Sequence, residues 1–269
     1  MEGGRAAAVL PAVFLALLHA APAHAESDEA ALAEKLNDPV APLINVPIDL
    51  TFDEKYGRGE GDRYTLKAKP VIPIPLNDEW RVISRTILPL TYQDGVTGNG
   101  GDKFGLGDIS QSFFFVPHND SGIIFGAGPV LLTPTATDEA LGGGKWGAGP
   151  TAVIVKKGGG WTLGMLASQT WSFAGSGSSD RDDVNSLLVQ PFVAYTTPQA
   201  WTYNLQSEST YDWDEGQAAI PLNFTISKLV KIGLQPVSFS GGVGYWLEHP
   251  DNGPKGWRFK LGATFAFPE

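Results

Sequence analysis

The sequence contains no cysteine, which excludes disulfide bonds, thiolate metal sites and thiol nucleophiles. It also has no apolar run of the roughly 20 residues that a membrane-spanning helix needs. Charged residues make up only 18% of the chain. The formal charge of -10 argues against a nucleic-acid partner, because nucleic acids bind basic surfaces. Stability must therefore come from backbone hydrogen bonds and packing.

The N-terminal 25 residues have the features of a secretory signal peptide. Arg5 lies near the start, an apolar run covers 6–18, and Ala-His-Ala at 23–25 is typical of a cleavage site. We expect the mature chain to begin at Glu26. The alternative, an N-terminal membrane anchor, requires a longer apolar run.

Residues 26–43 form a leader before the first expected strand. The segment DEAALAEKLN at 28–37 has helical composition, and Asp38-Pro39 would end the helix. Two interpretations remain open for this periplasmic leader. It is either a plug or adaptor helix, or a short and partly ordered connection.

The chain is rich in glycine, with 33 residues, and in aromatic residues, which make up 11%. Beyond residue 40, apolar and polar residues alternate with a period of two in segments bounded by turn residues. We expect a single domain at 44–269, an antiparallel up-and-down transmembrane β-barrel with an even number of strands. The twelve expected strands are 44–56, 63–75, 80–92, 105–116, 122–133, 145–156, 160–173, 184–196, 200–212, 216–228, 235–247 and 257–267.

The alternation separates a membrane barrel from a soluble sandwich. In the seventh segment, Trp161, Leu163, Met165, Ala167, Trp171 and Phe173 share one face, with Leu166 and Gln169 as exceptions to the pattern. Aromatic residues at both ends of an apolar band are typical of a strand that crosses two bilayer interfaces. A sandwich with solvated polar faces is the alternative, and it does not explain these aromatic ends.

The opposite face is too polar for a sandwich core, since buried charges without partners cost several kcal/mol each. A watery lumen removes that cost. The alternative is that the charges pair directly and fill the barrel. Our candidates for lumen-lining residues are Lys67, Lys69, Arg81, Arg85, Gln190, Gln206, Glu208, Asp212, Arg258 and Lys260.

Connections between the expected strands alternate between short and long. The short ones cover 76–79, 117–121, 157–159 and 197–199, and the long ones cover 93–104, 134–144, 174–183 and 248–256. Barrels of this class keep short turns in the periplasm and long loops outside, so both termini should be periplasmic. Interior prolines remove ladder donors, so we expect strand ends or bulges beside Pro47, Pro70, Pro73, Pro89, Pro191 and Pro221.

Other candidate sites are weak. We predict no catalytic residue, no cofactor and no metal site. Two acidic clusters in the outer loops are either solvated or could bind divalent cations and bridge lipopolysaccharide. A lipid hydrolase would need a serine beside His249, because His118 lies at the opposite end of the barrel. The acidic clusters are Asp180, Asp182 and Asp183, and Asp212, Asp214 and Glu215.

Seven segments of the chain are similar to segments of a known family: LNDPVAPLINVPI (36–48), RYTLKAKPVIPIPLNDEWRVISRTILPLTYQ (63–93), GLGDISQSFFF (105–115), GKWGAGPTAVIVKK (144–157), WSFAG (171–175), DVNSLLVQPFVAYTT (183–197) and ESTYDW (208–213). Through them the chain resembles the uncharacterised outer-membrane "transporter" family. That family is often grouped with the phenol-degradation MetA-pathway proteins, and some of its members are mislabelled neuromedin U. The resemblance implies a barrel that passes solutes, including aromatic or other hydrophobic compounds. The terminal Pro268-Glu269 departs from the aromatic end that barrel assembly commonly uses.

We therefore expect a pore or transport protein in the outer membrane of a Gram-negative bacterium, in contact with membrane lipid and lipopolysaccharide. Small solutes would cross it passively. The rival hypothesis is a closed structural or adhesive barrel whose external loops bind a partner or lipopolysaccharide. A lipid hydrolase is the third alternative.

Overall fold

A computed structural model describes residues 23–97, 101–118, 122–175 and 182–268. Most of the expected signal peptide, 1–22, lies outside the described residues, so its cleavage stays a prediction. Among the described residues, no helix is long and apolar enough to cross a membrane.

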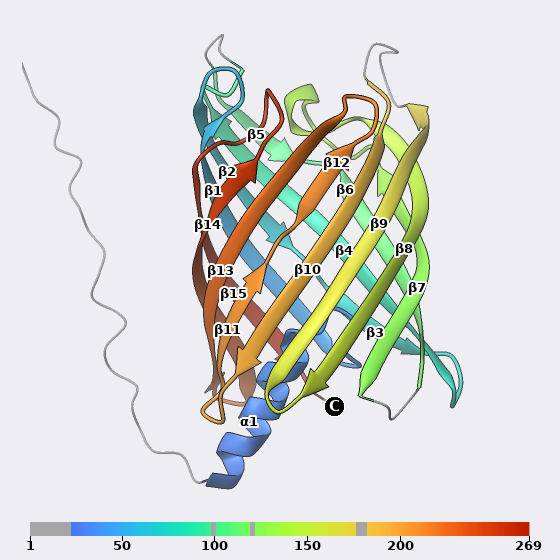
Figure 1. Ribbon diagram of the computed structural model, residues 1–269, viewed down its shortest axis with the longest axis vertical. Helices are drawn as coiled ribbons and strands as arrows, with labels where there is room; N and C mark the ends of the chain where they lie inside the picture. The colour runs from blue at the N-terminus through green and yellow to red at the C-terminus, as the bar shows by residue number, and fades with distance from the viewer. Residues whose placement is uncertain (1–22, 98–100, 119–121, 176–181, 269) are drawn as a thin grey trace, which may run out of the picture.

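The strands form one closed antiparallel barrel in which each pairs with its neighbours along the chain and β15 returns to β1 (Figure 1). This confirms the up-and-down fold, because the fifteen strands make twelve passes, three of them interrupted. The interrupted passes are β2 with β3, β5 with β6, and β11 with β12. The strands are β1 (Ile44–Tyr56), β2 (Gly61–Ala68), β3 (Val71–Pro75), β4 (Trp80–Asp94), β5 (Lys103–Leu106), β6 (Ile109–Pro117), β7 (Ile123–Thr133), β8 (Lys145–Gly158), β9 (Trp161–Gly175), β10 (Asn185–Thr196), β11 (Trp201–Gln206), β12 (Ser209–Asp212), β13 (Gln217–Ile232), β14 (Gln235–Glu248) and β15 (Trp257–Phe267).

Proline explains why the three passes break. Pro70 separates β2 from β3. The gap between β5 and β6 faces Pro89, whose carbonyl accepts from Gly107 N at 2.9 Å. The gap between β11 and β12 faces Pro191, whose carbonyl accepts from Ser207 N at 3.1 Å. Since proline has no N–H for the ladder, the neighbouring strand loses a partner and leaves the regular register there.

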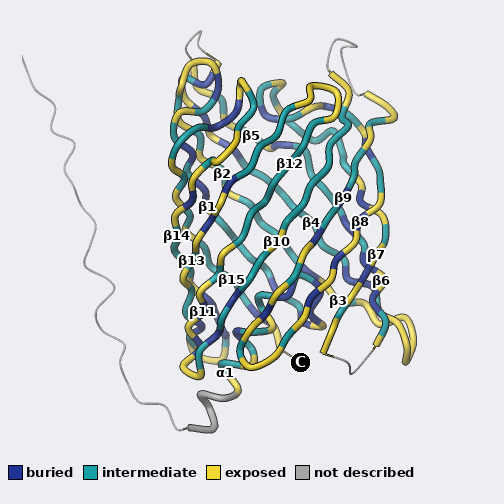
Figure 2. Tube along the Cα trace, viewed as in Figure 1, coloured by how far each residue is buried: buried dark blue, intermediate teal, exposed yellow. Residues whose placement is uncertain are grey.

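The outer face is apolar and carries aromatic side chains at both ends, as the alternation predicts. At the end with short turns, Trp161 and Tyr195 have ring centroids 4.9 Å apart. At the end with long loops, Tyr245 and Trp257 are 5.3 Å apart. Exposed and less exposed residues alternate along the strands (Figure 2). Leu166 is an apolar exception on the mostly polar inner face, where it joins a buried cluster.

The helix α1 (Ala23–Leu36) lies at the end of the barrel that also holds the C-terminus (Figure 1). It begins five residues earlier than expected and includes the Ala-His-Ala motif. Ala33 packs against Ala200 and Leu229, which attaches the helix to β13 and to the turn before β11. The helix therefore lies against the barrel mouth.

The segment after the helix closes this mouth. Val40 and Ala41 are fully buried, and Leu43 is nearly so. Val40 packs with inward-facing apolar residues of five strands, namely Val71, Ile83, Phe114, Val116, Val153, Val155 and Leu166. We call this end of the barrel the closed end and the opposite one the open end.

Candidate functional site

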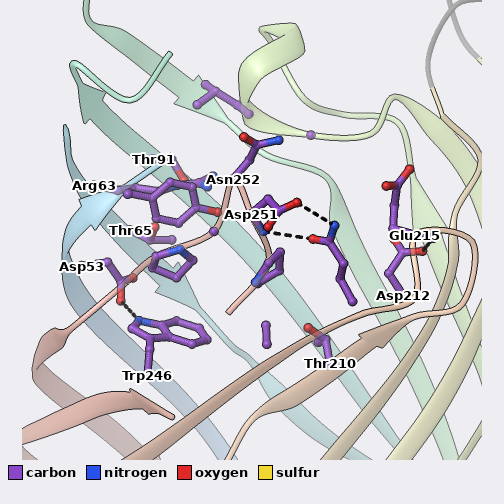
Figure 3. A pocket seen from close by; sticks show the side chains of 18 of the residues that line it. Asp53, Arg63, Thr65, Thr91, Thr210, Asp212, Glu215, Trp246, Asp251 and Asn252 are labelled. Carbon is purple, nitrogen blue, oxygen red and sulfur yellow. Dashed lines mark hydrogen bonds between the residues drawn. The ribbon is translucent and has the colours of Figure 1, made fainter. Parts of the chain in front are cut away.

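The open end leads into a cavity of about 1280 Å³ that occupies the barrel interior beneath the long loops. We call it the vestibule. Figure 3 shows Asp53, Arg63 and Trp246 on one side of it, and Asp212 and Glu215 on another. Its lining is mostly polar, with few large apolar side chains. Water and polar solutes can therefore enter this half of the lumen at little desolvation cost.

The wall formed by β1, β2, β14 and β15 carries two arginines stacked on aromatic rings. Arg258 lies 4.3 Å from the centroid of Trp246, and Arg63 lies 4.6 Å from that of Tyr56. Asp53 accepts two hydrogen bonds of 2.9 Å from Arg258 and one of 2.9 Å from Trp246 Nε1. These contacts hold the arginines flat against the wall and keep the vestibule open.

Deeper in the lumen, charged side chains from several strands converge. Each of the bases among them interacts electrostatically with Glu208, which lies at the break between β11 and β12. The bases come from strands β2, β4 and β15 and from Lys69, just after β2. We call this set the charge belt, and it consists of Lys67, Lys69, Arg85, Glu208 and Lys260.

Within the part of the chain that the structure describes, only one member of the charge belt forms a direct ion pair. Lys69 Nζ lies 2.5 Å from Asp49 Oδ2, with both side chains about four-fifths buried. Among the described residues, no ion pair within 4.0 Å and no hydrogen bond involves the side chains of the other four members, Lys67, Arg85, Glu208 and Lys260. The alternative that lumen charges neutralise one another directly thus applies to only part of the set.

The remaining predicted lumen residues lie outside the charge belt. Arg81 lies toward the closed end, where its charge is opposed by Asp38 and its Nε has no hydrogen-bond partner. Gln206 pairs in register with Phe192 on the inner wall, and Gln190 lies two residues before Phe192 on the same strand. Asp212 lines the vestibule and caps the turn after β12 by accepting from two backbone N–H groups.

The described members of the acidic clusters do not form a metal site. No group of three or more potential ligands occurs among the described residues, and Asp180 lies outside them. Asp183 accepts hydrogen bonds from Lys145 Nζ at 3.1 Å and Ser172 Oγ at 3.2 Å. Together these contacts hold the pKa of the Asp183 carboxyl below its usual range, and Lys145 contributes more to this shift than Ser172 does. Asp214 instead accepts a hydrogen bond from Asn185.

The two histidines of the expected mature chain, His118 and His249, lie at opposite ends of the barrel. His118 Nδ1 lies 2.7 Å from the carbonyl oxygen of Asp78, in the turn region of the closed end. His249 Nδ1 lies 3.1 Å from the carbonyl oxygen of Pro250, in a loop of the open end. Among the described residues, no serine side chain forms a hydrogen bond with His249. The described part of the barrel therefore does not assemble the geometry of a serine hydrolase.

An ion pair anchors the segment that fills the closed end. Asp38 has a fully buried side chain, and its Oδ2 lies 2.7 Å from Lys157 Nζ near the end of β8. Its Oδ1 accepts a hydrogen bond of 2.9 Å from Val40 N. One carboxylate thus links the leader to the barrel wall and shapes the chain for the insertion of Val40.

Four residues that organise the lumen were not among our candidates: Asp38, Asp49, Asp53 and Arg63. The strand residues could have been identified from the sequence. Asp49 and Asp53 alternate with outward-facing Leu50 and Phe52, and Arg63 lies on the same face of β2 as Lys67. Asp38 has no such signal, because its role depends on how the leader folds back into the barrel.

No family model matches the chain, and no curated protein matches it. Several solved structures are similar to the chain. The COG4313 outer membrane channel from Pseudomonas putida F1 is similar with a TM-score of 0.65 and 17% identity, covering 84% of this chain and 96% of that one. The KdgM porin is similar with a TM-score of 0.50 and 10% identity, over 83% and 99%. The Salmonella typhi outer membrane phospholipase, a dimer with bound calcium, has a TM-score of 0.46 and 10% identity, over 91% and 98%. The likenesses to the channel and the porin establish the barrel fold.

Proposed function

We propose that the protein is an outer-membrane channel of a Gram-negative bacterium, exported with a cleaved signal peptide, through which small solutes pass passively. The observation that carries this proposal is the open vestibule that leads to unpaired charges. A purely structural barrel gains nothing from holding such charges apart, because unpaired charges destabilise a protein interior. The apolar outer face with aromatic ends supports a bilayer location, in contact with lipid and lipopolysaccharide.

The vestibule suits solutes that are polar at one end and aromatic at the other. Charged and hydroxyl groups would receive the polar part, and the guanidinium groups that lie flat over Tyr56 and Trp246 offer planar surfaces on which a ring can stack. The aromatic compounds implied by the family resemblance fit this lining if they carry a charge. A wholly hydrophobic solute would gain little from these polar walls.

Passage through the barrel requires the leader segment at 38–43 to leave the closed end. We expect the leader to act as a plug, so the mature protein should conduct rarely or weakly. Displacing the segment exposes Val40 and Leu43 to water, at a cost of about 1.5–3 kcal/mol for each large apolar side chain. Such a cost permits brief opening events.

The test is single-channel conductance in planar bilayers with two truncations. A chain that begins at residue 44 lacks the plug, and a chain that begins at residue 37 lacks only the helix. We expect large and stable open steps from the first and conductance near that of mature protein from the second. If the chain from residue 44 shows no conductance although its barrel remains folded in detergent, the channel proposal is refuted.

A closed structural or adhesive barrel remains the second candidate, favoured by the apolar packing around Val40. It predicts that the chain from residue 44 stays silent. Deletion of the external loops, rather than substitution in the lumen, would then abolish binding to a partner or to lipopolysaccharide. Measuring both phenotypes on the same preparations distinguishes the two candidates.

A further inference from the structure

The charges of the belt do not balance once the direct ion pairs beside it are removed from the count. Asp49 pairs with Lys69, and Asp53 pairs with Arg258. What remains in the charge belt is three bases, Lys67, Arg85 and Lys260, against Glu208 alone. The belt therefore carries an excess of positive charge in a barrel whose overall charge is negative.

These unpaired groups remain accessible to water. The polar atoms of Lys67, Arg85 and Lys260 are absent from the set of fully buried atoms without a hydrogen-bond partner, which among the described residues includes Arg63 Nε and Arg81 Nε. Lys67 also lines the vestibule directly. A solute that enters from the open end can thus reach the belt without first breaking an ion pair.

We propose that the charge belt is a binding site for small organic anions that carry a carboxylate. The proposal rests on the proposed function, since the vestibule is the route by which the anion arrives. Two lysine ammonium groups and a guanidinium offer several charge-assisted hydrogen bonds to two carboxylate oxygens. A spherical anion such as chloride cannot use this arrangement of donors as fully.

Glu208 has a distinct role in the site. It lies across the lumen from the bases and interacts with Lys67 and Lys260. A bound anion would be repelled by its carboxylate, so Glu208 keeps binding weak enough for release. A channel needs such a balance, because a solute that binds too tightly does not leave.

Arg63 offers a donor on the path to the charge belt. Its Nε is buried without a hydrogen-bond partner, although its guanidinium stacks on Tyr56 at the vestibule wall. The vestibule lining as a whole holds more acids than bases, so the excess of positive charge is confined to the charge belt. An anion is therefore attracted by the belt itself and not by the outer part of the vestibule.

The test is calorimetric titration of folded mature protein in detergent micelles, which does not depend on conduction. Acetate and benzoate are the probes, with chloride and uncharged benzyl alcohol for comparison. We expect both carboxylates to bind and the comparison solutes to bind at least tenfold more weakly. The double variant Lys67→Gln/Lys260→Gln should weaken carboxylate binding by about 10- to 100-fold, the range expected for lost charge-assisted hydrogen bonds. Glu208→Gln should strengthen it by about tenfold, since one repulsive charge is removed.

The matched control is Lys255→Gln, which removes one positive charge at the open rim, where Lys255 pairs with Glu60. It should leave binding unchanged. Equal binding of chloride and acetate, or equal weakening by the rim and belt variants, would overturn the proposal. Because binding is measured without conduction, a silent barrel that still binds benzoate would refute the channel and keep the site. A conducting barrel that binds no carboxylate would refute the binding site and keep the channel.

Discussion

The ion pair between Asp38 and Lys157 should control how often the closed end opens. Replacing Asp38 with Asn removes the negative charge and keeps an oxygen that can accept from Val40 N, so the change isolates the ion pair. Breaking a fully buried pair costs about 3–5 kcal/mol. The Lys157 side chain is 20% exposed and can turn toward water, so we expect about 2 kcal/mol. At about 1.4 kcal/mol for each factor of ten, the open population should rise about 30-fold.

The absence of cysteine supplies a clean assay for this prediction. A single Val40→Cys substitution places a thiol in the buried cluster, where a maleimide reaches it only after the leader has left the barrel. When the leader closes faster than the reagent reacts, the labelling rate is proportional to the open population. We expect labelling to be about 30-fold faster when Asp38→Asn is added to Val40→Cys.

The control is Asp28→Asn, at an exposed position of helix α1, which should not alter the labelling rate. A change of less than twofold with Asp38→Asn, in protein that remains folded, would show that apolar packing alone holds the leader. The ion pair would then have no part in keeping the closed end shut.

Two further predictions concern stability. Leu229→Ala should lower the free energy of unfolding by about 2–5 kcal/mol, because Leu229 is fully buried beneath the helix. Urea titration in micelles would measure this, with the outward-facing Ile226→Ala expected to cost less than half as much. At the open end, the lowered pKa of Asp183 means that its pairing with Lys145 is fully present above the usual carboxyl pKa. The pairing is lost as pH falls through the lowered value, so the protection factor of the Val184 amide, its exchange rate compared with the intrinsic rate at the same pH, should fall in acid. Lys145→Gln should remove that pH dependence.

The alternation of residues was sufficient to predict the barrel. Each expected strand falls on an observed pass, because side chains on a strand face opposite sides with a strict period of two. The prolines likewise indicated where the ladder fails, and Pro70, Pro89 and Pro191 stand beside the three interruptions. A residue that lacks an N–H acts locally, so its effect can be predicted without knowing the partner strand.

The helix was predicted less well. Its composition indicated a helix at 28–37, and the structure extends it back to Ala23. The two interpretations of the leader, plug or connection, could not be separated by local sequence. The choice depends on contacts with Leu229 and Val153, which lie far along the chain.

The amino-acid sequence by itself determined the strand pattern, the closed barrel and the inward orientation of the charged residues, because these follow from alternation and from the cost of exposing polar groups to lipid. Only the tertiary structure decided which charges meet. Lys69 finds Asp49 on the adjacent strand, whereas Lys67 and Lys260 face Glu208 across the lumen without touching it. The division of the lumen into an open polar half and a closed apolar half was also decided there. Strand tilt and the return of the leader set those distances, and neither is encoded in the period of any single strand.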